Sequence, residues 1–183
     1  MNATLDYDVS GAGPTVIALH GLTSSRARDA GLGLDLSCRA SGNRVIRYDA
    51  RGHGDSSGDD DPRSYTWSAL ALDLLALMDA TSPSEAVHGV GQSMGTATLL
   101  HAALARPDRF ASLVLGIPPT AWGSRVAQRR VYRVNADLVE RAGVAPLLAA
   151  DVDAARPPAS TATVALPPTV AEALMPPVFR GAA

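Results

Sequence analysis

The hydrophobic residues of the chain fall into short runs separated by longer amphipathic stretches, a pattern typical of alternating strands and helices. Residues 5–9 alternate apolar and polar positions like a half-exposed strand, whereas residues 15–19 form a continuous apolar run that suits a strand covered on both faces. The pattern predicts strands at 5–9, 15–19, 44–48, 86–90 and 111–115.

Apolar residues at helical spacing occupy the stretches between these strands. A weak pattern from about residue 25 to residue 41 is loosened by Gly31 and Gly33, and a stronger one follows Ser64. A third begins after Ser93 and ends before Pro107, because a proline disfavours helical geometry in the preceding residue. The alternation predicts an α/β fold for residues 1–118, with a mostly parallel twisted sheet and helices on both faces.

Residues 119–183 differ from this core. Residues 122–133 are arginine-rich and predict a helix, and residues 136–148 predict a second one. Pairs of prolines follow at 157–158, 167–168 and 176–177. A segment of short helices and proline-rich turns beyond the carboxyl end of a strand indicates a lid or cap, and the alternative is an unstructured tail.

Composition and charge exclude several function classes. Hydrophobic residues make up 46% of the 183 positions and the net charge is −2, which argues against binding to nucleic acid or to an anionic membrane. The chain has no lysine, so no lysine Schiff base can form. The single cysteine, Cys38, offers neither an internal disulfide nor a metal cluster, and neither metal nor cofactor is expected. Without a signal peptide or a membrane-spanning apolar run, a cytoplasmic protein is predicted.

The strongest chemical signal is Gly91-Gln92-Ser93-Met94-Gly95, which stands between a predicted strand and a predicted helix. A serine on such a sharp turn has strained backbone, and side chains two residues to either side would collide with the neighbouring strand and helix. The helix that begins after Ser93 directs its N-terminal N–H groups at the place where negative charge develops in acyl transfer. The alternative interpretation is a glycine-rich turn with an ordinary serine.

Two further loops follow strands in the same way. His20-Gly21-Leu22 comes after the strand at 15–19, and Asp49-x-Arg51-Gly52-His53-Gly54-x-Ser56 comes after the strand at 44–48. The carboxyl ends of parallel strands meet at one edge of a sheet, where ligands bind. We therefore expect one crevice there, rimmed by His20, Asp49, Ser93 and Ile117.

These three motifs, in this order, resemble an α/β-hydrolase-fold serine hydrolase over roughly residues 5–115. The resemblance implies that Ser93 is the nucleophile and that the backbone N–H groups of Leu22 and Met94 form the oxyanion hole. It also implies residues that mainly shape the loops around the site, namely His20, Gly21, Asp49, Arg51, His53, Gly91 and Gly95.

The chain departs from this family in its general base, which serine needs before it can attack an acyl group. The family places an acid and then a histidine after the serine, but no histidine follows His101. His88 in the strand and His101 in the helix should not reach the serine, while His20 and His53 stand at positions that the family uses for loop structure. No acidic residue ends the strand at 111–115 either.

The sequence therefore predicts the N-terminal part of a hydrolase whose aspartate and histidine come from a further C-terminal segment, lost by truncation or proteolysis or carried by another chain. The apolar strand at 111–115 would otherwise be an uncovered edge, so we expect that segment or a second copy to pair with it. The predicted function is hydrolysis of an ester, amide or related acyl bond of a small substrate through an acyl-serine intermediate. The alternative is a non-catalytic hydrolase-like protein that binds a small ligand or a partner.

Overall fold

The computed structural model describes residues 3–34, 42–119 and 122–146. The described residues up to Pro119 form one compact unit, and residues 122–146 belong to a second. Among these residues, no helix is both long enough and apolar enough to cross a membrane.

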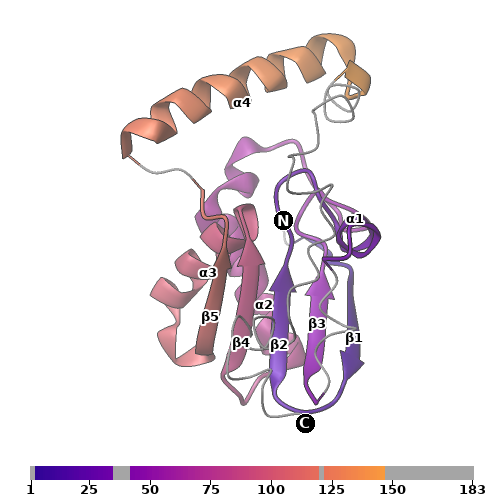
Figure 1. Ribbon diagram of the computed structural model, residues 1–183, viewed down its shortest axis with the longest axis vertical. Coiled ribbons are helices and arrows are strands. Elements are labelled where there is room, and N and C mark those ends of the chain that lie inside the picture. Colours follow the sequence, from indigo (N-terminus) through magenta and orange to yellow (C-terminus); the bar gives the residue numbers. More distant parts are fainter. Residues whose placement is uncertain (1–2, 35–41, 120–121, 147–183) are drawn as a thin grey trace, which may run out of the picture. The chain divides into compact units, whose positions relative to one another are not determined.

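The first unit is built on a five-stranded sheet in the order β1-β3-β2-β4-β5 (Figure 1). All pairs are parallel except β1 with β3, which is antiparallel. The predicted mostly parallel sheet is therefore confirmed, and the first strand begins two residues later than expected. The strands are β1 (Tyr7–Gly11), β2 (Thr15–Leu19), β3 (Arg44–Tyr48), β4 (Val87–Gln92) and β5 (Phe110–Gly116).

Among the described residues, three α-helices accompany this sheet: α1 (Arg26–Gly31), α2 (Trp67–Thr81) and α3 (Met94–Ala105). The 3-10 turns η1 (Pro62–Tyr65) and η2 (Pro107–Arg109) precede α2 and β5. The hydroxyl of Thr66 accepts a hydrogen bond from the Ala69 N–H and so caps α2, which a run of leucines then extends. Helix α1 is shorter than predicted, and the rest of that prediction, at residues 35–41, lies outside the described residues.

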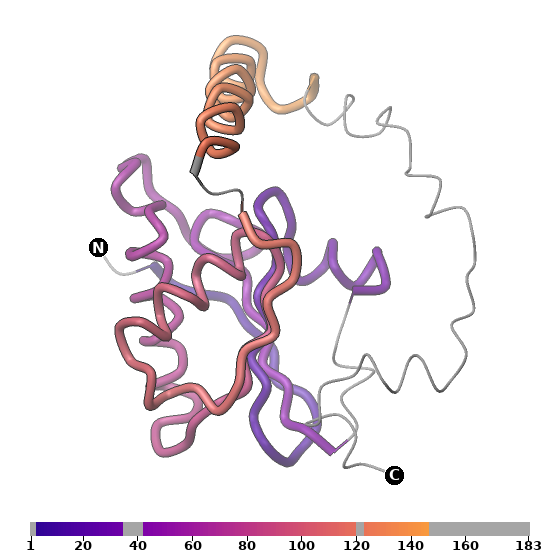
Figure 2. Tube along the Cα trace, turned by 60° about the vertical axis from the view of Figure 1, so that its left-hand side comes forward, coloured from indigo at the N-terminus to yellow at the C-terminus, as the bar shows by residue number. Residues whose placement is uncertain are grey.

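Helices α2 and α3 pack on one face of the sheet and α1 lies on the other, as Figure 2 shows. The main core contains alternate strand residues such as Ile17 and Ile46, together with Leu74 of α2 and Leu99 of α3, and all four are fully buried. Full burial of each such side chain contributes about 1.5–3 kcal/mol. This core fixes the strand ends, and with them the loops at the carboxyl edge of the sheet.

In the described part of the second unit, α4 (Trp122–Ala142) runs without interruption past residue 135, so the predicted break between two helices there was wrong. No glycine or proline stands between Ser124 and Ala142, and a helix propagates through such a stretch once it is nucleated. Gly143 ends it with a φ of 72° and donates its N–H to the Val139 carbonyl at 2.8 Å. The proline pairs lie outside the described residues, and the lid stays a prediction.

Candidate active site

Ser93 stands at a sharp turn between β4 and α3, with φ 49° and ψ −108°. A positive φ is strained for a residue with a side chain, so the surrounding contacts must hold it. The Ser93 N–H donates to the Gly116 carbonyl at 2.9 Å. The hydroxyl of Thr96 lies 2.8 Å from the carbonyl oxygens of both Gly91 and Gly116. These bonds fix the turn to β4 and β5.

The glycines on either side of the serine have the steric role that the sequence predicts. A Cβ on Gly91 would lie 2.6 Å from the backbone carbon of Gly95. A Cβ on Gly95 would lie 2.6 Å from the carbonyl oxygen of Leu19 and 2.7 Å from its Cβ. Real Cβ atoms do not approach backbone atoms so closely, so α3 can leave β4 at this angle only with glycine at both positions.

The two N–H groups predicted to face an oxyanion come from different segments. Met94 is the first residue of α3, where a helix leaves its N–H groups without an intrahelical acceptor. Leu22 lies in the loop after β2, which passes close to the serine, because a Cβ on Gly21 would lie 3.6 Å from the Ser93 Cβ. Within the described residues, no hydrogen-bond partner engages either N–H group or the Ser93 hydroxyl.

His20 is buried, with 4% of its surface exposed, and both of its ring nitrogens are engaged. Its Nε2 accepts the Ala50 N–H at 2.9 Å, which leaves Nδ1 as the donor to the Gly21 carbonyl at 2.8 Å. Burial lowers the pKa of His20, and the backbone bond to Gly21 only partly opposes this. The neutral ring joins two loops and has no acceptor nitrogen left for a proton from serine.

The other histidines do not supply the base either. The Nδ1 of His53 lies 2.9 Å from the Arg51 carbonyl oxygen, and its ring packs 5.1 Å from that of His20. The Nδ1 of His88 lies 2.8 Å from the Ser112 hydroxyl between β4 and β5, and His101 is exposed on α3. All four histidines are among the described residues, and none of them hydrogen-bonds to Ser93 there.

Asp49 organises the loop after β3. Its carboxylate is buried and accepts the Arg26 N–H at 2.7 Å, the Arg26 Nε at 3.2 Å and the Asp55 N–H at 3.2 Å. Burial alone would raise the pKa of Asp49, but these donors outweigh it and the pKa lies below its usual value. A Cβ on Gly54 would lie 2.3 Å from the carboxylate, so the loop wraps tightly around it.

Arg51 continues this network on the side of α2. Its guanidinium forms a two-pronged pair with Asp73, at 2.9 and 2.7 Å, and reaches Asp59 at 3.2 Å. Asp6, Asp49 and Asp55 also lie close enough together to hold a metal ion, but the guanidinium of Arg26 pairs with all three carboxylates. The charges of this loop are thus matched to one another.

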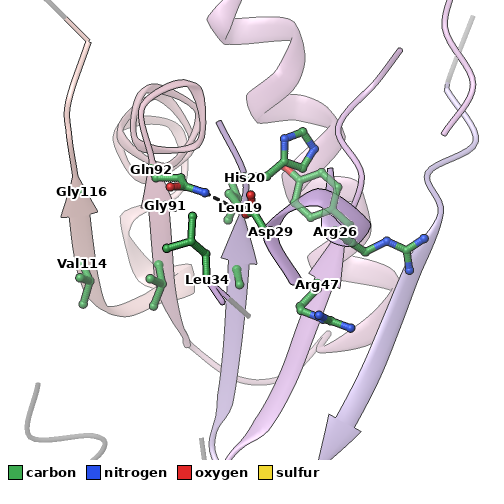
Figure 3. A pocket seen from close by; sticks show the side chains of 13 residues that line it. Leu19, His20, Arg26, Asp29, Leu34, Arg47, Gly91, Gln92, Val114 and Gly116 are labelled. Carbon is green, nitrogen blue, oxygen red and sulfur yellow. Dashed lines mark hydrogen bonds between the residues drawn. The ribbon is translucent and has the colours of Figure 1, made fainter. Parts of the chain in front are cut away.

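A cavity of about 200 Å³ lies beside the turn at Ser93, on the sheet face that α1 covers (Figure 3). Ala18, Val90 and Val114 form its floor, and Asp29 and Gln92 are joined across its rim by a hydrogen bond of 2.8 Å. Of the four residues predicted to rim one crevice, only His20 lines this cavity. Sequence reasoning missed Asp29, because nothing in its local pattern distinguishes it from an ordinary helical carboxylate.

The chain matches the model of the alpha/beta hydrolase fold over residues 14–131, which is more than half of its length. It is 31% identical over 128 residues to the sn-1-specific diacylglycerol lipase ABHD11 of Xenopus tropicalis, covering 66% of this chain and 39% of that protein. It is 38% identical over 121 residues to an epoxide hydrolase of Caballeronia sordidicola, covering 63% of this chain and 34% of that protein. The chain thus spans roughly a third to two fifths of the length of these curated relatives.

Solved structures give the same result. A thermophilic esterase from Thermogutta terrifontis with malate bound superposes with a TM-score of 0.62 at 27% identity, covering 78% of this chain and 50% of that one. Potato epoxide hydrolase I superposes with a TM-score of 0.56 at 30% identity, covering 62% of this chain and 36% of that one. Sequence and structure agree, and the chain belongs to the alpha/beta hydrolase fold family.

Proposed function

We propose that this chain carries the nucleophile and oxyanion hole of a serine hydrolase that cleaves an ester, thioester or amide of a small substrate. The observation that carries the proposal is the turn at Ser93. The backbone of this serine is strained, and its hydroxyl and the N–H groups of Leu22 and Met94 have no partner among the described residues. Ser93 is half-buried, and a hydroxyl without a partner beside two backbone N–H groups without acceptors is an arrangement that favours a reacting group.

In this mechanism the Ser93 Oγ attacks the acyl carbon and transfers its proton to a base. The carbonyl oxygen becomes an oxyanion that accepts hydrogen bonds from the N–H groups of Leu22 and Met94. The leaving group departs with a proton, and water then hydrolyses the acyl-serine ester. The name of one curated relative, a diacylglycerol lipase, supports an acyl bond as the target.

The base is the part of the mechanism that the four histidines of this chain do not provide. We propose that a histidine and an aspartate come from a further segment, or from a second copy of the chain, that pairs along β5. Within the described sheet β5 is an edge strand paired only with β4, and 40% of Leu115 and 78% of Ile117 are exposed just where such a segment would arrive. An unprotected apolar edge is a pairing site.

A fluorophosphonate probe tests the nucleophile, because it phosphonylates an activated serine and leaves an ordinary one unmodified. We expect a single adduct on Ser93, found by intact mass and peptide mapping, when the further segment or a second copy that supplies the base is bound, and none in Ser93→Ala. Hydrolysis of an activated ester should vanish in the same variant. Full esterase activity in Ser93→Ala would refute the proposal.

The second candidate is a non-catalytic protein that binds a small ligand or a partner, and the absence of a base among the described residues favours it. The same probe separates the two candidates. An unlabelled Ser93 in folded protein, both alone and at concentrations that drive self-association, would support the binding function instead.

A further inference from the structure

We infer that Asp29 is a positioning residue of the candidate active site, because its carboxylate joins the loop that carries Leu22 to the turn that carries Ser93. The inference rests on the proposed function. Asp29 Oδ1 accepts a hydrogen bond from the Ser24 hydroxyl at 2.6 Å. Its Oδ2 accepts one from the Gln92 side-chain N–H at 2.8 Å, as Figure 3 shows. Each carboxylate oxygen thus holds a different segment.

The two residues that Asp29 holds are direct neighbours of the reacting groups. Gln92 is the last residue of β4 and immediately precedes Ser93. Ser24 lies two residues after Leu22, across the turn that the Ser24 N–H closes on the Gly21 carbonyl at 3.2 Å. A charged acceptor forms stronger hydrogen bonds than a neutral one, which favours a fixed distance between the two segments.

The loop needs such a link because its own backbone does little to fix it. Between residues 20 and 24, the bond from Ser24 to Gly21 is the one backbone–backbone hydrogen bond within the described part of the chain, apart from those of the sheet. Thr23 has a φ of 63°, a conformation that is unfavourable for a β-branched residue. His20 holds the Gly21 carbonyl at the start of the loop, and the side-chain link from Asp29 adds the restraint on its far end, at Ser24.

The consequence is kinetic. An oxyanion hole works only when both donors stand at hydrogen-bond distance from the developing charge, and that charge is absent from the bound substrate. Loosening the Leu22 donor should therefore lower kcat and leave KM nearly unchanged. A residue that only stabilised the fold would instead lower the amount of active protein without changing either constant.

The first experiment measures the link itself, by hydrogen exchange of the peptide spanning residues 20–25 in the whole chain. Asp29→Ala removes both bonds and should speed exchange of this peptide by about tenfold, given that each bond contributes modestly. Asp29→Asn should exchange like the wild type, because its amide can accept from Ser24 and donate to a flipped Gln92 side chain. Asp60→Ala, which removes an exposed carboxylate from another loop, is the matched control. Equal exchange in Asp29→Ala and wild type would overturn the inference.

The second experiment measures ester hydrolysis that depends on Ser93. We expect Asp29→Ala to lower kcat by about ten- to a hundredfold with KM within about twofold, and Asp29→Asn to restore most of it. Turnover abolished by Ser93→Ala but untouched by Asp29→Ala would overturn the role of Asp29 alone. Turnover that Ser93→Ala leaves intact would overturn the proposed function, and with it this role.

Discussion

The loop after β3 and the turn after β4 lie at the same edge of the sheet, yet their polar groups are satisfied very differently. In the loop after β3, Asp49 accepts hydrogen bonds from both Arg26 and Asp55, and Arg51 pairs with Asp73 and Asp59. At the turn after β4, the Ser93 hydroxyl has no hydrogen-bond partner among the described residues. The loop that is rich in charged side chains is thus a structural network, whereas the proposed nucleophile has no hydrogen-bond partner in the described part of the chain.

This comparison predicts that changes at the two places have separable effects. Changes in the loop after β3 should lower the free energy of unfolding, because they leave buried charges unpaired. Changes at the proposed oxyanion donors beside Ser93 should lower the reactivity of Ser93 and leave the free energy of unfolding nearly unchanged. One position, Gly95, should affect both the stability of the fold and the reactivity of Ser93.

Gly95→Val should have the largest effect, because it collides with the backbone of β2 at a distance that no rotamer can relieve. We expect the free energy of unfolding to fall by about 4 kcal/mol or more, which is in the range of exceptional single substitutions. Urea unfolding followed by circular dichroism measures this. Gly31→Ala is the control, since no heavy atom lies within 4 Å of the added Cβ and stability should be unchanged or slightly raised. A Gly95→Val protein with wild-type stability would contradict the steric account of the turn.

Arg51→Ala should destabilise the fold by about 3 kcal/mol, because it leaves the carboxylates of Asp73 and Asp59 without their guanidinium. The rate at which a fluorophosphonate labels Ser93 should stay within about twofold of wild type at temperatures where the variant is folded. Arg63→Ala breaks an exposed pair with Asp61 instead and should not shift the unfolding midpoint. A large loss of labelling in folded Arg51→Ala would erase the distinction between the two regions.

Leu22→Pro should lower ester turnover on the order of a hundredfold, because it removes one of the two proposed oxyanion donors while the Ser93 hydroxyl stays in place. Leu22→Ala keeps the N–H group and should turn over at close to the wild-type rate. Hydrogen exchange of β2 and α1 reports whether the proline variant keeps its fold. A folded Leu22→Pro with an unchanged rate would show that this N–H group is not a donor.

Much of this arrangement follows from local sequence. The strands and the steric need for Gly91 and Gly95 could be predicted, because period, β-branching and turn residues act over a few neighbouring positions. The link between Asp29 and Gln92 could not, because it spans 63 positions and depends on how α1 packs. The continuity of α4 was mispredicted, since weak apolar spacing near residue 135 does not stop a helix that contains no breaking residue.

His20, whose ring bonds to the loop after β3, adds a further difference between that loop and the turn at Ser93, namely in how stability depends on pH. Burial lowers the pKa of its ring below 6.5, and the neighbouring His53 adds to this, while Asp49 and Asp29 act in the opposite direction. The unfolded chain therefore takes up a proton on this histidine at a higher pH than the folded chain does. The stabilisation from a neutral His20 is complete above pH 6.5 and is lost progressively as the pH falls below it.

His20→Asn should accordingly flatten the dependence of stability on pH between about pH 7 and pH 5, a range in which the carboxylates of the network remain ionised. The effect is the smallest of the four, because one proton changes the free energy of unfolding by no more than about 1.4 kcal/mol per pH unit. Urea midpoints at several pH values give the slope, which is independent of the constant loss of stability from removing the bond to Ala50. His101→Asn, at an exposed position on α3, should leave the slope unchanged. If His20→Asn keeps the wild-type slope, then the fold does not hold the ring neutral, and the account of His20 as a neutral link between the two loops is wrong.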